Sequence, residues 1–413
     1  MSGSIPIVVD QHAENTAFLW LLRDAAVLGA NYTLEDLAEL DYRVEANLDG
    51  LRVAENLGWT TSKSALELGE PGEVFAAASL AIENADGARI DEVLKVAAQS
   101  RDNIRAFVSA LGWFEYSRVE ALIETFLSAN SNLYQHLGLS ACAIHRVDPG
   151  EMLIRHLGSD SLPLRTRALR AVGELKRADL ASSIREHWQA EDEHCRFWAL
   201  WSSVLLGDTD AATALKAFVR PQSLYADRAV QVIARVTEGE LLQNWLSSLA
   251  REESTRRFAL LGAGYSGDPF YMPGLFNQME EPDFARVAGE AFSLITGADL
   301  AYLDLDVDGP EGHESGPSED PEDDTVDLDP DEDLPWPGRP HIEAWWAAHS
   351  AQYTAGERYL CGARISESQC ENVLAIGYQR QRHAAALELA LMGEATLPEV
   401  RAPGYRQKKQ WRS

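Results

Sequence analysis

The sequence predicts an all-α protein, specifically an α-solenoid of HEAT- or armadillo-like helix pairs with repeats of about 30 residues. Small or apolar residues recur between residues 105 and 300 at intervals of 29 to 31 residues: Ala106, Leu137, Ala168, Ala199, Ala229, Ala259 and Ala288. A second series of bulkier residues keeps the same interval: Leu127, Leu157, Trp188, Phe218, Leu249 and Met279. Because two series run in phase, we expect two helices in each repeat.

One repeat shows why these positions predict helices. Leu164, Ala168, Ala171, Val172 and Leu175 are spaced i, i+4, i+7, i+8 and i+11, so they share one helix face. The alanines in this face let neighbouring helices approach closely. We therefore expect each repeat to bury this face against the next repeat.

Residues 1–72 are expected to form an N-terminal helical cap. Apolar residues at helical spacing predict one helix over residues 11–28 and a second over residues 34–51. Thr33 and Asp36 before the second helix resemble a capping box. Residues 59–72 are rich in Gly, Ser and Thr and are predicted to be a connection. The solenoid then follows over residues 73–302.

The turns between paired helices repeatedly carry Gly, Asp and Pro, as in Gly207-Asp208 and Gly267-Asp268-Pro269. Gly ends a helix readily, and Asp caps the start of the next one. These aspartates therefore have a structural explanation, and no catalytic role is assigned to them.

The repeat pattern stops near Leu300, and residues 303–334 are expected to be a flexible acidic segment. Fifteen acidic residues lie between Asp304 and Asp333 without any Lys or Arg. Residues 335–413 then predict a C-terminal helical region, with helices near residues 340–349, 368–376 and 380–392. From Arg401 onward the chain is basic. This basic end is expected either to lie across the acidic segment or to stay solvated.

Composition disfavours nucleic acid and membrane surfaces as partners. The 413 residues include 65 Asp and Glu but only 36 Lys and Arg, giving a formal net charge of −29. Such a charge repels phosphate and anionic lipid. The four cysteines form no C-x-x-C pair, and no long apolar run or basic leader is present. We therefore expect a cytoplasmic protein with reduced thiols and no zinc site.

Three motif matches fail in their context, so no catalytic residue, cofactor or metal site is predicted. Gly262 to Gly267 fits G-x-G-x-x-G, but no βαβ unit surrounds it. The same stretch nearly forms a G-x-S-x-G elbow around Ser266, but its last position is Asp268. Residues 304–309 copy the first half of a calcium loop, yet Ser315 stands where the loop needs a bidentate acid.

Five residues are candidates for contact with a partner protein: Trp336, Trp345, Trp346, Arg358 and Tyr359. The tryptophans adjoin the acidic segment. They are expected to dock that segment onto the solenoid or, as the less favoured alternative, to form an exposed binding hot spot.

Five stretches together resemble a bacterial family of HEAT-like repeat proteins: residues 12–20, 40–51, 286–297, 333–337 and 377–386. Genes of that family often lie beside genes for type VI secretion spike proteins, PAAR proteins and effector adaptors. The resemblance implies an accessory or chaperone-like role in loading an effector onto the spike. It supplies no catalytic residues.

The preferred hypothesis is therefore a protein-binding scaffold whose partner is an effector, its adaptor or a spike component. A first alternative is an immunity protein that inhibits a toxin through the acidic segment, which would mimic nucleic acid. A second alternative is an enzyme on a helical-repeat scaffold, which the absence of a catalytic motif disfavours.

Overall fold

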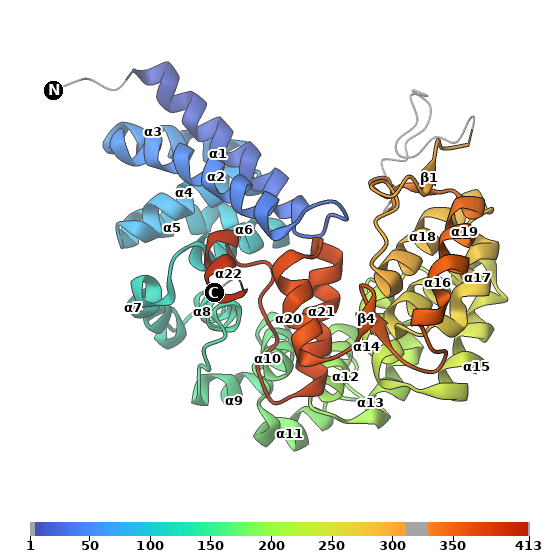
Figure 1. Cartoon of the computed structure of the whole chain (residues 1–413). Helices are drawn as coiled ribbons and strands as arrows, with labels where there is room; N and C mark the ends of the chain where they lie inside the picture. Colours follow the sequence, from blue (N-terminus) through green and yellow to red (C-terminus); the bar gives the residue numbers. More distant parts are fainter. Residues whose placement is uncertain (1–4, 311–328, 330, 412–413) are drawn as a thin grey trace, which may run out of the picture. The chain divides into compact units, whose positions relative to one another are not determined.

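The computed structural model describes residues 5–310, 329 and 331–411, and it confirms an all-α, solenoid-like fold (Figure 1). The described chain has four short strands, which form two antiparallel pairs. In one, β1 (Asp306–Val307) pairs with β2 (Trp336–Pro337), and in the other β3 (Tyr359–Leu360) pairs with β4 (Ala363–Arg364). None of the described helices combines the length and the apolar composition that crossing a bilayer requires.

Three helices open the chain: α1 (Pro6–Ala26), α2 (Leu34–Val53) and α3 (Asn56–Ala65). The predicted capping box is present, because the Thr33 side chain accepts from the Asp36 amide and the Asp36 carboxylate accepts from the Thr33 amide. The prediction that residues 59–72 form a connection is wrong over most of this range, because α3 continues to Ala65. Tertiary packing overrides weak helix propensity there, as α3 packs on α1 and buries Trp59.

The residues of the first periodic series each lie on a separate helix, which we call the A helix of its repeat. These A helices are α6 (Arg101–Trp113), α8 (Asn132–His145), α10 (Leu162–Glu174), α12 (Glu193–Leu205), α14 (Ala226–Val236), α16 (Glu253–Ser266) and α18 (Pro282–Thr296). We also count α4 (Pro71–Glu83), which packs on α6 one repeat before the series begins, as an A helix. From α6 to α18, every member of the series is buried. The period in the sequence is therefore the period of helix packing.

The second series follows the B helices, which pair with the A helices. These are α5 (Gly87–Ala97), α7 (Tyr116–Ser128), α9 (Glu151–Leu157), α11 (Ala181–Arg185), α13 (Thr209–Leu215), α15 (Gly239–Ala250) and α17 (Met272–Gln278). Short 3-10 turns extend several of them: η2 (Ala178–Leu180), η3 (Lys216–Phe218) and η4 (Pro269–Tyr271). Thus each repeat holds two helices, as the two phased series predict.

The chain forms two compact units. Unit 1 consists of residues 1–202 and 394–413, and unit 2 consists of residues 203–393. In the core of unit 1, the ring of Trp20 stacks on Phe75 at 5.1 Å between centroids. In unit 2, Ile342 joins a core that contains Phe276 and Phe292.

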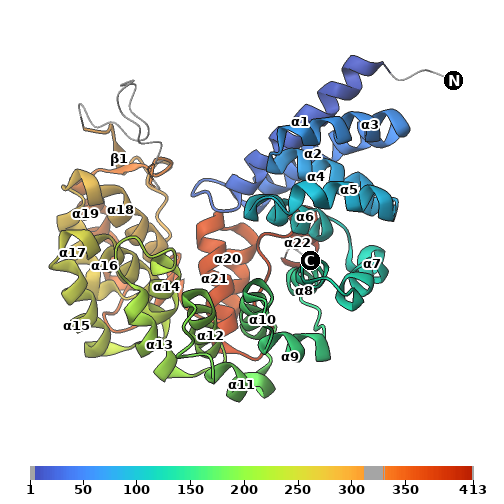
Figure 2. The ribbon, with the colours of Figure 1, turned by 180° about the vertical axis from the view of Figure 1, so that it is seen from behind.

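Four further helices follow the acidic segment: α19 (Arg339–His349), α20 (Glu367–Ile376), α21 (Gln379–Met392) and α22 (Gly404–Trp411), with η5 (Ser350–Gln352) after α19. Of the two expectations for the basic end, contact with the acidic segment concerns residues 311–328 and 330, which lie outside the described residues. The basic end does not simply stay solvated. It forms α22, which packs on α2 and lies beside α6 and α8 in both views (Figures 1 and 2).

Most of the predicted acidic segment, residues 311–328 and 330, lies outside the described residues. Its two ends are described. Asp306 and Val307 pair with Trp336 and Pro337, and Asp329 and Asp331 form ion pairs with arginines of unit 2. The segment therefore begins and ends on unit 2.

Candidate functional site

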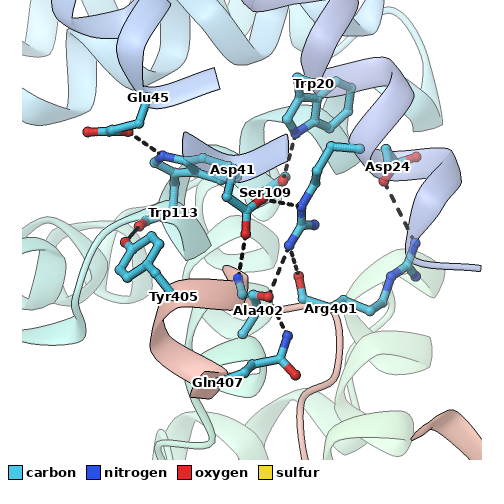
Figure 3. A network of polar contacts seen from close by, with 12 residues as sticks. Trp20, Asp24, Asp41, Glu45, Ser109, Trp113, Arg401, Ala402, Tyr405 and Gln407 are labelled. Atoms are coloured by element: carbon cyan, nitrogen blue, oxygen red, sulfur yellow. Dashed lines mark hydrogen bonds and ion pairs between the residues drawn. The ribbon is translucent and has the colours of Figure 1, made fainter. Parts of the chain in front are cut away.

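A network of polar contacts on unit 1 holds the chain's own C-terminal segment (Figure 3). We call residues 394–411 the tail. The tail site comprises the following groups: the side chains of Arg23, Asp41 and Arg146, and the backbone carbonyls of Gly112, Trp113, Phe114 and Glu174. All of them lie on α1, α2, or the C-terminal ends of A helices.

The C-terminal end of α6 provides three acceptors. The last carbonyls of an α-helix have no partner within the helix, and they carry partial negative charge. Tyr405 donates its hydroxyl to the Trp113 carbonyl at 3.0 Å. Arg406 donates to the Phe114 carbonyl at 2.9 Å and also to the Gly112 carbonyl. The tail therefore satisfies the end of α6 and places a cation at its negative pole.

Arg23 and Asp41 form a buried ion pair beneath the tail. The Arg23 Nε to Asp41 Oδ1 distance is 2.8 Å, and both side chains are at most 4 % exposed. Arg23 Nη2 donates to the carbonyls of Arg401 and Ala402 at 2.8 and 3.0 Å, and the second oxygen of Asp41 accepts from the amide of Gly404. Because buried polar groups need partners, this pair presents one donor group and one acceptor to a peptide backbone.

Gly404 fits where no larger residue does. A Cβ atom built on it would lie 2.7 Å from the Ala38 amide nitrogen and 2.9 Å from the Ala38 Cα atom. Both atoms belong to the backbone of α2, so they cannot move aside as a flexible side chain would. The tail site therefore requires glycine immediately before the Tyr405-Arg406 pair.

The other end of the tail is held by a main-chain hydrogen bond and by the side chain of Arg146. The amide of Leu397 donates to the carbonyl of Glu174, the last residue of α10, at 2.9 Å. Arg146 Nε donates to the Leu397 carbonyl at 2.5 Å, and its guanidinium pairs with Glu399 at 3.0 Å. Arg146 caps α8 in the left-handed conformation with φ of 57°. These contacts stabilise a backbone geometry that non-glycine residues adopt at a cost of about 1–2 kcal/mol.

Charges beside the tail shift the pKa values of two buried groups. Burial disfavours the charged form of the Glu174 carboxylate, but the guanidiniums of Arg167, Arg170 and Arg146 outweigh it and lower its pKa to about 2. For His145, burial and then the positive charge of Arg406 lower the pKa to about 4. At neutral pH the site thus holds a charged Glu174 and a neutral His145.

The five residues proposed from the sequence as partner contacts all lie on unit 2, and they fall into two groups. Trp336, Trp345 and Trp346 are half-buried. Arg286 lies over the Trp336 ring at 4.6 Å, and Trp345 meets Phe292 edge-on at 5.5 Å. Trp336 and Trp345 therefore pack on the A helix α18, whereas Trp346 packs against Phe276 of α17, and part of each ring stays at the surface.

Arg358 and Tyr359 form the second group. The amide of Tyr359, which is 3 % exposed, donates to the Gly267 carbonyl at 2.9 Å. Arg358 donates to the Ser266 carbonyl at 2.9 Å and pairs with the buried Glu388 at 2.5 Å. These residues close the C-terminal end of α16, so unit 2 uses the same contact that the tail makes at α6.

The glycines of the G-x-G-x-x-G match serve packing. A Cβ on Gly264 would lie 2.9 Å from the Cα of Ala291 on the neighbouring A helix, and Gly267 ends α16 in the left-handed conformation. In the half calcium loop, Asp306 belongs to β1. Across residues 5–310, 329 and 331–411, no three His, Cys, Asp or Glu side chains are grouped as a metal ion would need.

Sequence reasoning missed the tail site, although two signals pointed to it. Asp41 interrupts the apolar stripe of α2, and a buried carboxylate in such a stripe needs a partner. The Gly404-Tyr405-Arg406 sequence combines one residue without a side chain with two strong donors. Nothing in the sequence says that these stretches, more than 350 residues apart, meet.

Comparison with known proteins adds no family assignment. No family model matches the sequence, and no curated protein matches it. Among solved structures, the crystal structure of an engineered protein aligns with 69 % of this chain and 93 % of its own, with 14 % identity and a TM-score of 0.30. A likeness this weak supports no statement about function.

Proposed function

We propose that this protein is a protein-binding scaffold, and that it acts in the cytoplasm as an accessory chaperone that helps load a type VI secretion effector or its adaptor onto the spike. The observation that supports protein binding is the tail site. Unit 1 binds a peptide segment there through the ends of α6 and α10 and a buried ion pair. The secretion context rests on the family resemblance of the sequence.

The chemistry of the tail site is that of peptide recognition. Five of its contacts use the tail's own backbone: the carbonyls of Arg401, Ala402 and Leu397, and the amides of Leu397 and Gly404. Main-chain contacts supply affinity, whereas Gly404, Tyr405 and Arg406 supply selectivity. A partner segment with Gly followed by an aromatic donor and Arg would make the same contacts.

Binding in trans tests this proposal. The receptor is the full chain carrying Gly404→Val and Arg406→Gln, which weakens the resident tail and leaves the tail site unchanged. A fluorescein-labelled peptide of residues 394–413 is expected to bind this variant at least tenfold more tightly than it binds the wild-type chain. The same peptide with Gly404→Val is the matched control and is expected to bind poorly.

The outcome is informative in both directions. If circular dichroism shows the receptor variant to be folded and the wild-type peptide still does not bind, the tail site is only an intramolecular brace. Equal binding of the two peptides would show that the site does not read the glycine.

Capture from the native host tests the biological role. Affinity purification of the wild-type chain and of the Gly404→Val, Arg406→Gln variant, followed by mass spectrometry, is expected to recover an effector, an adaptor or a spike component, with more recovered by the variant. Recovery of none of these from cells that express the secretion system would contradict the chaperone role.

One observation keeps the immunity-protein alternative in view. Both described ends of the acidic segment are fixed on unit 2, through the β1–β2 ladder and through Asp329 and Asp331. An inhibitor that acts through an acidic run needs that run to be attached to the protein at its ends. Deleting residues 311–328 is expected to abolish protection against a toxin if the run inhibits it, and to leave effector capture intact if the protein is a chaperone.

A further inference from the structure

Unit 2 carries a pair of arginines at equivalent positions of consecutive repeats. Arg257 on α16 and Arg286 on α18 each stand two residues before a member of the first periodic series, Ala259 and Ala288. Equivalent positions on adjacent A helices are separated by about 8–10 Å, the usual distance between packed helices. The two guanidiniums are thus held in a fixed relationship by the repeat itself.

Both arginines hold carboxylates of the acidic segment. Arg257 contacts Asp331 through two nitrogens, Nη1 to Oδ2 and Nη2 to Oδ1, the latter at 3.0 Å. Arg286 Nη2 contacts Asp329. A bidentate arginine pair has a defined geometry as well as charge, so it distinguishes a carboxylate from a diffuse counterion.

The segment that carries Asp329 and Asp331 is held by hydrogen bonds of its own. The Asp331 amide donates to Asp329 Oδ1 at 2.8 Å, and the Glu332 amide donates to the Asp329 carbonyl at 3.1 Å. This turn directs the two carboxylates toward the two arginines. Leu334, 4 % exposed, and Trp336, whose ring lies under Arg286, follow as apolar anchors.

The arginines require an anionic occupant. Arg286 is only 5 % exposed, and arginine does not lose its charge in proteins, so an empty site would leave a buried cation without its carboxylate. Tyr265 and Asp227 also lie near Arg257. Their electrostatic effect on Arg257 is weaker than that of Asp331, which holds the guanidinium through two nitrogens.

The acidic segment offers this ligand pattern more than once. Acids alternate with other residues at Asp304, Asp306 and Asp308, and again at Asp327, Asp329 and Asp331. A pair of carboxylates two residues apart is therefore a repeated and simple signal, which another protein can present as well. A tethered segment competes at an effective concentration in the millimolar range.

We propose that Arg257 and Arg286 form a recognition site for an acidic peptide segment of a partner protein, with two carboxylates two residues apart followed by an apolar anchor, and that Asp329 and Asp331 occupy this site as an internal competitor. The site lies on unit 2 and does not depend on peptide binding at the tail site. Displacement of the internal segment would release the acidic run at one end.

A peptide-binding experiment tests the site. The probe is a labelled peptide of residues 326–338, Val-Asp-Leu-Asp-Pro-Asp-Glu-Asp-Leu-Pro-Trp-Pro-Gly, measured by fluorescence anisotropy against the full chain. Asp329→Asn with Asp331→Asn in the protein removes the internal competitor. This variant is expected to bind the peptide at least tenfold more tightly than the wild-type chain does.

Three controls define what is recognised. Adding Arg257→Gln to the open variant is expected to reduce binding at least tenfold, whereas Arg256→Gln, which removes the same charge from the neighbouring residue, is expected to change it less than twofold. Arg257→Lys, which keeps the charge and loses the bidentate contact, is expected to lie between them. The peptide carrying both Asp→Asn changes is expected not to bind.

Several results would overturn the proposal. Absence of binding to an open variant that circular dichroism shows to be folded would make the two ion pairs purely structural. Equal binding to the wild-type and open chains would rule out internal competition. Equal binding of a single-stranded oligonucleotide would show a general anion site rather than one for acidic peptides.

Discussion

The guanidinium of Arg406 reaches the C-terminal end of helix α6 and donates a hydrogen bond to the carbonyl of Phe114 at 2.9 Å. These residues stand almost 300 positions apart in the sequence. The contact joins the last helix of the chain to an A helix near its start, and it gives both the tail and α6 the partners that they lack locally.

Arg406→Gln is expected to destabilise unit 1. The change removes the cation from the end of α6 and breaks hydrogen bonds to the carbonyls of Gly112 and Phe114. Hydrogen bonds that involve a charged group contribute about 1.5–3 kcal/mol, so we expect a loss of about 2 kcal/mol in the free energy of unfolding, measured in urea. Lys409→Gln, at an exposed position of the same helix, is the control, and an equal loss there would refute the specific contact.

Gly404→Ala is expected to detach the tail without unfolding the A helices. The added Cβ meets backbone atoms of Ala38, so α22 must shift away from α2. Hydrogen exchange followed by mass spectrometry is expected to show faster exchange in residues 397–411 and little change elsewhere in unit 1. Gly87→Ala has open space around its new Cβ and serves as the matched control. Unchanged exchange in the tail would show that α2 accommodates the methyl group.

Acidification is expected to weaken unit 1 between pH 6.5 and 4. Burial and Arg406 lower the folded-state pKa of His145 from 6.5 to about 4, so in that range the unfolded chain binds a proton that the folded chain does not. The stabilisation is complete above pH 6.5 and is lost as the pH falls through 4. A shift of this size corresponds to roughly 3 kcal/mol.

His145→Gln isolates this residue's contribution. Gln keeps a donor for the Leu111 carbonyl, which His145 contacts at 3.2 Å, and it does not titrate. His136, whose pKa burial and Arg167 also lower to about 4, still contributes in the variant. The urea midpoint of the variant is expected to fall less steeply with pH than that of the wild type. Identical pH profiles would remove His145 as a cause.

Glu388→Gln is expected to destabilise unit 2 by about 3–5 kcal/mol. The Glu388 carboxylate pairs with Arg235 at 3.0 Å and with Arg358 at 2.5 Å, and its side chain is 3 % exposed. Removing the charge leaves the buried guanidinium of Arg235 without its counterion. Thermal unfolding followed by circular dichroism measures the loss. Glu371→Gln on α20, an exposed position, is the control, and a similar shift in both variants would contradict the role of the buried pair.

The two periodic series in the sequence were enough to predict the helical repeat, because the contacts between neighbouring repeats recur at the same interval. Ala168 and its equivalents occur where adjacent A helices touch, and the spacing of such contacts along the chain equals the length of one helix pair. Sequence motifs whose residues interact within one helical turn were predicted equally well, as the capping box of Thr33 and Asp36 shows. These features depend on residues close in sequence or on strict repetition, so the sequence by itself determined them.

Only the tertiary structure decided where the chain's last residues lie. Gly404, Tyr405 and Arg406 bind the end of α6 and the ion pair of Arg23 and Asp41. Arg257 and Arg286 pair with Asp331 and Asp329 of the acidic segment. Carbonyl groups at helix ends are present in every helix and leave no mark in the sequence. Which of them face a distant donor depends on long-range packing, so it emerges only in the folded chain.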